Sequence, residues 1–277
     1  MLGYIRNYLF ILGALLLVAS CGLKEGSTSV NSMVQAGEQP TPSKDIEYTD
    51  ILDAKQLSIS RSLGFGSANP QFLKTYTDPE TLAAFTAALK TAERMEGQLD
   101  IRVSDYDFIL EPADGGQSRK GHLWLDSSSG SGLYMNVSDT GTGYKLTEAS
   151  ARRLAEILGR ITYTPAQAEE NGDVVITSTG MRNVKVWSEF YQKVSSGEKA
   201  KVQVTRYTTE GEPIFDNLEF NGSDLLFQHD STWDSFGASE KYAEFCKRVE
   251  KKEAEDRAVY ELGGCTASFR LEINQGG

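Results

Sequence analysis

Hydrophobic and polar residues alternate along several short stretches in the first half of the chain. In residues 56–65, for example, Leu57 and Ile59 alternate with serines. A period of two residues is typical of strands that bury one face. Glycine-containing turns at 113–118 and 140–143 indicate that the later strands pair as two hairpins. The predicted strands are 56–65, 99–112, 119–126, 131–139 and 143–147.

Two segments of the same half have the spacing and the end signals of helices. The first runs from Asp78, a good N-cap residue followed by Pro79, to Gly97. The second runs from Thr147 to Gly159. The residues at helical spacing in the first segment, which we expect to be buried, are Leu82, Phe85, Leu89 and Met95.

The second half predicts an amphipathic helix and a series of strands. The helix begins at Asn183 and ends before Gly197, and its expected core residues are Val184, Trp187, Phe190 and Val194. Asn221-Gly222 favours a type I′ hairpin, because both residues tolerate positive φ. We interpret residues 239–256 as another helix. The predicted strands are 174–178, 200–210, 213–220, 224–230, 258–265 and 268–273.

These elements form two regions of similar order: a strand, a helix and then an antiparallel meander. The pattern predicts the α+β class, with two small domains in which an antiparallel sheet packs against one or two helices. The polar segment 164–173 is expected to be a linker. The predicted boundaries are 53–160 for the first domain, 161–173 for the linker region and 174–277 for the second domain.

The first residues have the pattern of an export signal. One cation, Arg6, precedes an apolar run from Leu9 to Val18, which is too short to span a bilayer. The run ends in Val-Ala-Ser-Cys21, which resembles the lipobox of bacterial lipoprotein precursors, where the cysteine sulfur carries the lipid. An ordinary signal peptide with a chance cysteine is the alternative.

On the lipobox interpretation, residues 1–20 are a signal peptide and Cys21 becomes the lipidated first residue. Residues 21–52, poor in large apolar side chains and rich in Gly, Ser, Thr, Pro and Gln, are then a flexible tether. Two or more acyl chains, such as palmitate, anchor a protein stably. We therefore expect a protein attached to the extracytoplasmic face of the cell membrane by lipid, without a membrane-spanning segment.

The charge of the chain argues against one class of partner. The formal net charge is −11, and it is near −12 without Arg6. Such an acidic chain has no basic surface for nucleic acid, so we expect no nucleic-acid partner. Solubility is the simplest interpretation of the acidity.

Two cysteines remain besides Cys21. In an exported chain, Cys246 and Cys265 favour one disulfide, which closes a loop of about 20 residues. Two free thiols or a metal pair are the alternatives. The two histidines, His122 and His229, lie far from the cysteines in sequence and on predicted strands, where packed or edge positions are expected. We predict no metal and no cofactor.

No arrangement of residues indicates a catalytic centre. Ser196 and Lys199 have the Ser-x-x-Lys spacing of penicillin-interacting enzymes, but they follow a helix instead of opening one, which favours a solvated turn. Aromatic side chains near turns of the second region are the remaining candidate, as an exposed binding patch. The alternative is that they belong to the core. These side chains are Tyr207, Phe215, Trp233 and Phe236.

Both regions resemble families without a known reaction. Residues 190–237, with the string Arg-Tyr-Thr-Thr-Glu-Gly-Glu-Pro-Ile, and the late Glu-Leu-Gly-Gly-Cys265 resemble the domain-of-unknown-function family 4362 of Gram-positive lipoproteins, whose members carry a similar late cysteine pair. Residues 122–148 resemble the YhfM-like domain. The resemblances imply a location and an architecture but no chemistry.

Together these patterns predict a membrane-anchored extracytoplasmic lipoprotein with a non-enzymatic binding or envelope-associated role, whose protein or envelope ligand is unidentified. One alternative is a cell-wall or peptide hydrolase with two carboxylates about 5–10 Å apart in a pocket. Another is a substrate-capturing lipoprotein of a transporter, for which the alternating βαβ pattern is absent.

Overall fold

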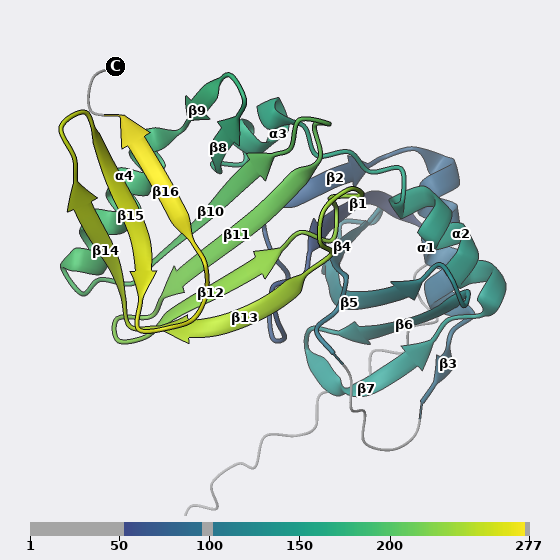
Figure 1. Ribbon diagram of the computed structural model, residues 1–277. Coiled ribbons are helices and arrows are strands. Elements are labelled where there is room, and N and C mark those ends of the chain that lie inside the picture. The colour runs from purple at the N-terminus through teal and green to yellow at the C-terminus, as the bar shows by residue number, and fades with distance from the viewer. Residues whose placement is uncertain (1–52, 96–101, 275–277) are drawn as a thin grey trace, which may run out of the picture. The chain divides into compact units, whose positions relative to one another are not determined.

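The computed structural model describes residues 53–95 and 102–274, which all belong to one compact unit (Figure 1). The predicted signal peptide, Cys21 and the whole of the predicted tether lie outside the described residues. The described residues form two larger sheets, one small sheet and four helices. The predicted α+β class is confirmed.

The first sheet has seven strands in the order β2-β1-β4-β5-β6-β7-β3, and every neighbouring pair is antiparallel. Its centre is the predicted meander, whereas the edge strands β2 and β3 were not predicted. The strands are β1 (Ala54–Arg61), β2 (Phe72–Tyr76), β3 (Glu93–Arg94), β4 (Tyr106–Pro112), β5 (Arg119–Asp126), β6 (Ser131–Asn136) and β7 (Asp139–Lys145).

Helices α1 (Pro79–Lys90) and α2 (Glu148–Leu158) pack against this sheet and against each other (Figure 1). Both predicted N-caps are confirmed: the side chain of Asp78 accepts a hydrogen bond from the Thr81 amide, and that of Thr147 accepts one from the Ser150 amide. The predicted end of the first helix is wrong. The helix ends at Lys90, so Met95 is not part of its buried stripe.

The second sheet has six strands in the order β13-β12-β11-β10-β8-β9. All neighbours are antiparallel except β8 and β10, which are parallel and are joined through helix α4 (Val184–Ser195). The strands are β8 (Val174–Thr177), β9 (Gly180–Arg182), β10 (Ala200–Tyr207), β11 (Pro213–Phe220), β12 (Leu225–Asp230) and β13 (Lys241–Cys246).

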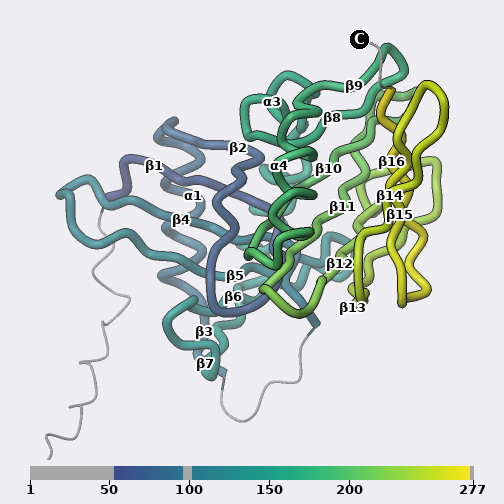
Figure 2. Tube along the Cα trace, turned by 90° about the vertical axis from the view of Figure 1, so that its left-hand side faces the viewer, coloured from purple at the N-terminus to yellow at the C-terminus, as the bar shows by residue number. Residues whose placement is uncertain are grey.

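A small sheet covers part of the second sheet and shares a core with α4. It comprises β14 (Arg248–Glu253), β15 (Arg257–Gly263) and β16 (Arg270–Asn274), drawn in yellow beside the larger sheet in Figure 2. Trp187 of α4 is fully buried, and its ring centre lies 5.6 Å from that of Phe269 and 5.3 Å from that of Tyr260. An aromatic cluster therefore joins the helix to the small sheet.

The first core receives side chains from both halves of the chain. It is formed mainly by the first sheet with α1 and α2, but Val175 of β8 and Phe215 of β11 belong to the same buried cluster. The two predicted regions are thus packed on each other within one compact unit.

The predicted helix over residues 239–256 is wrong, because the segment forms strands β13 and β14. Along β13, backbone pairing runs from Lys241 to Cys246 against β12. Along β14, the side chain of Lys252 pairs across the sheet with Glu261 of β15. Sheet pairing and cross-strand contacts override the helix propensity of a Lys- and Glu-rich sequence.

Two predicted turns differ from the observed ones. Residues 140–143 lie inside β7, and the turn that precedes β7 is at 137–138. Asn221 and Gly222 do join two strands, but of the two only Gly222 has a positive φ, of 106°. The Asn221 side chain instead accepts hydrogen bonds from the amides of Ser223 and Asp224, each 2.9 Å long, in a longer loop.

The segment 164–173, predicted to be a linker, is folded and packed. It contains α3 (Pro165–Glu170), whose N-cap Thr164 accepts a hydrogen bond from the Gln167 amide. Ala168 and Asp173 have no exposed surface. A low content of large apolar residues concealed this helix, because its buried residue is an alanine.

Among the described helices, none has both the length and the apolar character needed to cross a membrane.

Candidate functional site

The second sheet turns a polar face toward the first sheet. Strand pairing places Gln203, Asn217 and Gln228 in one row across β10, β11 and β12. Thr205, Phe215 and Asp230 form the next row, which Lys241 of β13 continues. Because side chains alternate between the faces of a strand, these residues all project to the same side.

Arg61, the last residue of β1, enters this polar face and is only 3% exposed. Its Nη1 donates to Oδ2 of Asp230 at 2.9 Å, and its Nη2 donates to Oδ1 of Asn217 at 2.6 Å. A longer bond of 3.3 Å joins Nη2 to Gln203. The guanidinium lies 3.7 Å from the ring centre of Phe215. One buried cation thus contacts three strands of the second sheet.

Asp173, which precedes β8, is the second buried charge at this contact. Its Oδ2 accepts hydrogen bonds from Thr205 at 2.7 Å, from Gln203 at 2.8 Å and from the hydroxyl of Tyr163 at 2.9 Å. Its Oδ1 accepts from Gln71 at 2.9 Å. Gln203 also accepts from Arg61, so the arginine and both carboxylates belong to one network.

The two carboxylates of this network differ in charge environment. Burial raises the pKa of Asp173 above its ordinary value, and the hydrogen bonds from Thr205, Gln203 and Tyr163 only partly oppose it. Burial acts in the same direction on Asp230, but the positive charges of Arg61 and Lys241 outweigh it and leave the pKa of Asp230 below its ordinary value. Asp230 is therefore the partner that compensates Arg61.

A cleft of about 710 Å³ opens beside this network. Residues of β1, β4 and α2 line it from the first region, and residues of β11, β12 and β13 line it from the second. Small-molecule sites have volumes of about 300–1,000 Å³ and occur where two sheets or lobes meet. Its aromatic and aliphatic lining includes Val103, Tyr106, Leu125, Leu158, Trp233 and Tyr242.

Among the residues that the structure describes, five Lys, Arg and Asp side chains line the cleft: Arg61, Arg102, Asp105, Asp230 and Lys241. Arg102 and Asp105 form a two-bond pair at the rim, with distances of 2.6 and 3.0 Å. Three cations and two carboxylates give this described lining a formal excess of one positive charge, in a chain whose net charge is −11. Burial and the charge of Asp105 raise the pKa of Tyr106 to about 12, so its hydroxyl stays protonated.

The two histidines are packed against aspartates, as expected for structural positions. Nδ1 of His122 lies 2.7 Å from Asp107 and that of His229 lies 2.8 Å from Asp216. Only His229 lines the cleft. Across the described ranges, no group of His, Cys, Asp and Glu side chains is arranged to hold a metal ion.

The four aromatic residues considered as an exposed patch do not form one. Phe215 has no exposed surface and supports the Arg61 guanidinium, while Tyr207 and Trp233 are partly buried against the first core. Only Phe236 is strongly exposed, at 79%. The alternation along β11 explains the correction, because it places Phe215 on the face covered by the first region.

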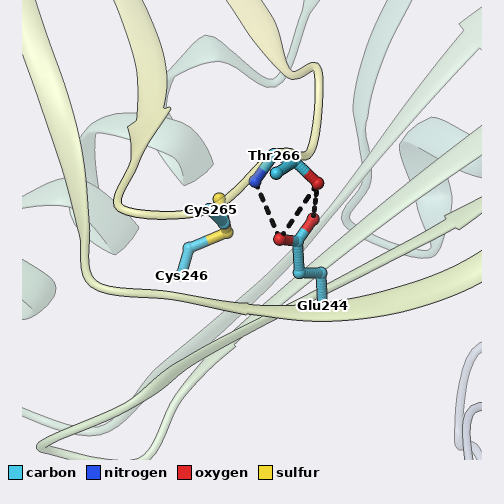
Figure 3. The surroundings of a disulfide bond; sticks show 4 residues. All are labelled: Glu244, Cys246, Cys265 and Thr266. Carbon is cyan, nitrogen blue, oxygen red and sulfur yellow. Dashed lines mark hydrogen bonds between the residues drawn. A yellow bond between two sulfur atoms is a disulfide. The ribbon is translucent and has the colours of Figure 1, made fainter. Parts of the chain in front are cut away.

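The predicted disulfide between Cys246 and Cys265 is confirmed, with the two Cα atoms 4.8 Å apart (Figure 3). It joins the end of β13 to the loop before β16. Beside it, the Glu244 carboxylate accepts hydrogen bonds from the amide and the hydroxyl of Thr266 (Figure 3). These bonds attach the small sheet to the edge of the larger one.

Sequence reasoning missed Arg61, Asp173, Asp230 and Lys241. A signal for Arg61 was present: in Leu-Ser-Ile-Ser-Arg, the arginine occupies the apolar phase of the alternation, which puts a cation on the core side of β1. Asp173 lay in the supposed linker and Lys241 in the supposed helix. Their roles depend on the packing of the two regions, which no local pattern encodes.

Comparison with known families supports the division into two regions. Residues 171–261 match the model of a family described as Domain of unknown function (DUF4362). Residues 66–162 match the family model described as YhfM protein. No curated protein and no solved structure matches the chain significantly. The described cleft is lined from both matched regions, so the chain combines similarity to DUF4362 in its second part with similarity to the YhfM family in its first.

Proposed function

We propose that this protein is a lipid-anchored extracytoplasmic binding protein, whose folded part holds a small ligand in the cleft beside Arg61. The observation that carries the binding role is the cleft itself. It has a ligand-sized volume, an aromatic and aliphatic lining, and a rigid wall formed by the buried Arg61 network.

The lipid anchor rests on the sequence around Cys21. The positive start, the short apolar run and the lipobox-like Val-Ala-Ser-Cys support export and acylation. The full-length protein is expected to partition into the detergent phase of a Triton X-114 extraction, and Cys21→Ala into the aqueous phase. Mass spectrometry of the mature amino terminus should find acyl chains on Cys21. A native product with its leader intact, or without lipid, would contradict the anchor.

The binding role is tested by blocking the cleft. Ala155 lines it from α2, so Ala155→Trp places an indole inside, whereas Ala87→Trp adds the same group to the exposed side of α1. Saturation-transfer NMR with a library of small aromatic and aliphatic fragments is the measurement. Fragments should bind the wild type and Ala87→Trp but not Ala155→Trp. Binding that Ala155→Trp leaves unchanged, or no binding to the wild type, would refute the cleft as a ligand site.

The hydrolase hypothesis receives less support from the geometry. The cleft does contain two carboxylates, Asp105 and Asp230, but each is bound to an arginine. A general acid needs a proton at neutral pH, and the low pKa of Asp230 keeps that group ionised. Turnover of a cell-wall fragment or peptide by the purified folded part would reverse this preference.

A further inference from the structure

Lys241 differs from the other charged residues of the cleft in its bonding. Its Nζ lies 3.6 Å from Oδ2 of Asp230 and 3.5 Å from the carbonyl oxygen of Ser104. Ordinary N–H···O hydrogen bonds are about 2.9–3.0 Å long, so both contacts are weak. The side chain is 31% exposed and lines the cleft.

The other four charged side chains of the lining already form short hydrogen bonds or ion pairs within the protein. Arg61 donates to Asp230, Asn217 and Gln203. Asp230 also accepts two bonds from Thr232 through its other oxygen. Both groups are thus held by short hydrogen bonds within the protein.

The same holds at the rim. Both oxygens of Asp105 accept from Arg102, and Oδ2 also accepts from the amide of Leu125 at 3.0 Å. Of the five charged side chains in the described lining, Lys241 is the one held only by long contacts, of 3.5 and 3.6 Å. Burial lowers the pKa of Lys241 and the charge of Asp230 only partly opposes it, as expected for a cation short of compensating charge.

We propose that Lys241 binds the carboxylate of a ligand that has one negative charge and an apolar ring or chain. This proposal rests on the proposed binding function and specifies its ligand class. The excess of one positive charge among the described lining residues matches a monoanion, whereas a dianionic phosphate would leave a net negative charge on them in a partly buried site. The apolar part of the ligand lies against Tyr106, Leu158 and Trp233.

The experiment compares three small probes of the same shape and different charge: phenylacetate, phenylacetamide and phenethylamine. Affinities are measured by saturation-transfer NMR on the wild type, Lys241→Gln and a control, Lys185→Gln, whose lysine is 88% exposed on α4. In parallel, the lysines of the wild type are labelled by ¹³C reductive methylation, which keeps their charge. Circular dichroism confirms that each variant is folded.

Phenylacetate should bind the wild type about tenfold more tightly than phenylacetamide does, and phenethylamine should bind least. Lys241→Gln should remove about this tenfold preference, while Lys185→Gln should keep it. The methyl signal of Lys241 should shift with phenylacetate, with the same midpoint as the binding curve.

Other outcomes separate this proposal from the proposed function. Equal binding of acid and amide to the wild type, lost in Ala155→Trp, would overturn carboxylate recognition and leave the cleft as a ligand site. A preference for phenylacetate that persists in Lys241→Gln would overturn the role of Lys241. If none of the three probes binds, the carboxylate proposal fails, and the fragment screen decides separately whether the cleft binds any ligand.

Discussion

The two faces of the six-stranded sheet are built from the same strands, but they bury different kinds of side chains: one mainly apolar, the other mainly polar. One face carries Val202, Leu218 and Phe227, which pack against α4 and the small sheet in an apolar core, beside the buried carboxylate of Asp216, which is paired with Arg206 and His229. The other carries Gln203, Thr205, Asn217 and Asp230, which are also buried but meet Arg61 and Asp173.

The apolar face mainly contributes stability, whereas the polar face mainly determines how the two regions are placed relative to each other. Apolar contacts are non-directional, so the first face tolerates small shifts in the position of α4 and the small sheet. Buried polar groups cost free energy unless each finds a partner with correct geometry, so the second face accepts only one placement of the first region. The ligand cleft lies beside the polar face, where the relative placement of the two regions shapes it.

The largest effect is expected from removing the cation of the polar face. Arg61→Met leaves Lys241, at 3.6 Å, as the cation nearest to the buried Asp230, and it leaves Oδ1 of Asn217 without the donor Arg61. The free energy of unfolding should fall by about 3–5 kcal/mol in urea denaturation.

Two further variants test that interpretation. Arg182→Met removes a surface pair whose members are 47% and 42% exposed, and should cost at most about 1 kcal/mol. Arg61→Met combined with Asp230→Leu removes both charges and should be more stable than Arg61→Met alone. If the double variant is as unstable as the sum of the single ones, the ion pair is not the reason for the loss.

On the apolar face, Trp187 is the matching position. It is fully buried, and its Nε1 has no hydrogen-bond partner among the described residues. Trp187→Ala should cost about 3–5 kcal/mol through the cavity it creates, whereas Trp187→Phe should cost less, because no polar partner is lost. Urea denaturation measures both. An equal cost for the two variants would mean that Nε1 has a partner, and would weaken the contrast between the faces.

The disulfide attaches the small sheet, which covers part of the apolar face, to strand β13. Its removal therefore tests how much the packing of the small sheet depends on a covalent link. The cysteines are 19 residues apart, and Cys246→Ala with Cys265→Ala should lower the free energy of unfolding by about 3 kcal/mol. The polar face should be unaffected, so fragment binding in the cleft should persist in the folded fraction. Loss of binding while the protein is still folded would show that the two faces are coupled.

The sequence predicted the apolar face better than the polar one, for a physical reason. Trp187 and Phe190 recur at helical spacing, and Leu225 and Phe227 recur at strand spacing, so local periodicity identified both elements. Periodicity assigns polar residues to solvent by default. Asp230 and Asp173 are both buried, and their partners Arg61 and Gln71 lie 169 and 102 residues away in the sequence.

The segments mistaken for a helix and a linker were misassigned for a related reason. Lys241 and Glu244 favour a helix in isolation, but pairing with β12 and the bond to Thr266 fix a strand. Ala168 gives no hydrophobic signal although it is fully buried in α3. Tertiary contacts decide these positions, and composition does not reveal them.

The pH dependence of stability distinguishes the two carboxylates of the polar face. Because folding raises the pKa of Asp173, this group's contribution to stability is fully present below its ordinary pKa of 3.8, and it is lost as the pH rises through the folded-state pKa. The pKa of Asp230 is lowered, so its contribution to stability changes with pH in the opposite direction. The stability of Asp173→Asn relative to the wild type should therefore increase as the pH rises from about 4 to 7. Urea denaturation across this range is the measurement, and a constant difference would contradict the raised pKa.

The smallest effects come from exchanging one methyl and one hydroxyl group at two positions of β10. Val202→Thr puts a hydroxyl opposite Leu218 in the apolar face, where Val202 is 6% exposed, and should cost about 1–3 kcal/mol. Thr205→Val removes the 2.7 Å bond to Asp173 and should cost only about 0.5–1.5 kcal/mol. Since that bond favours the charged form, Thr205→Val should also raise the pKa of Asp173 further, which NMR of the carboxyl carbon can follow. Equal costs at the two positions, with no change in that pKa, would mean that these two residues of one strand do not face the two environments described here.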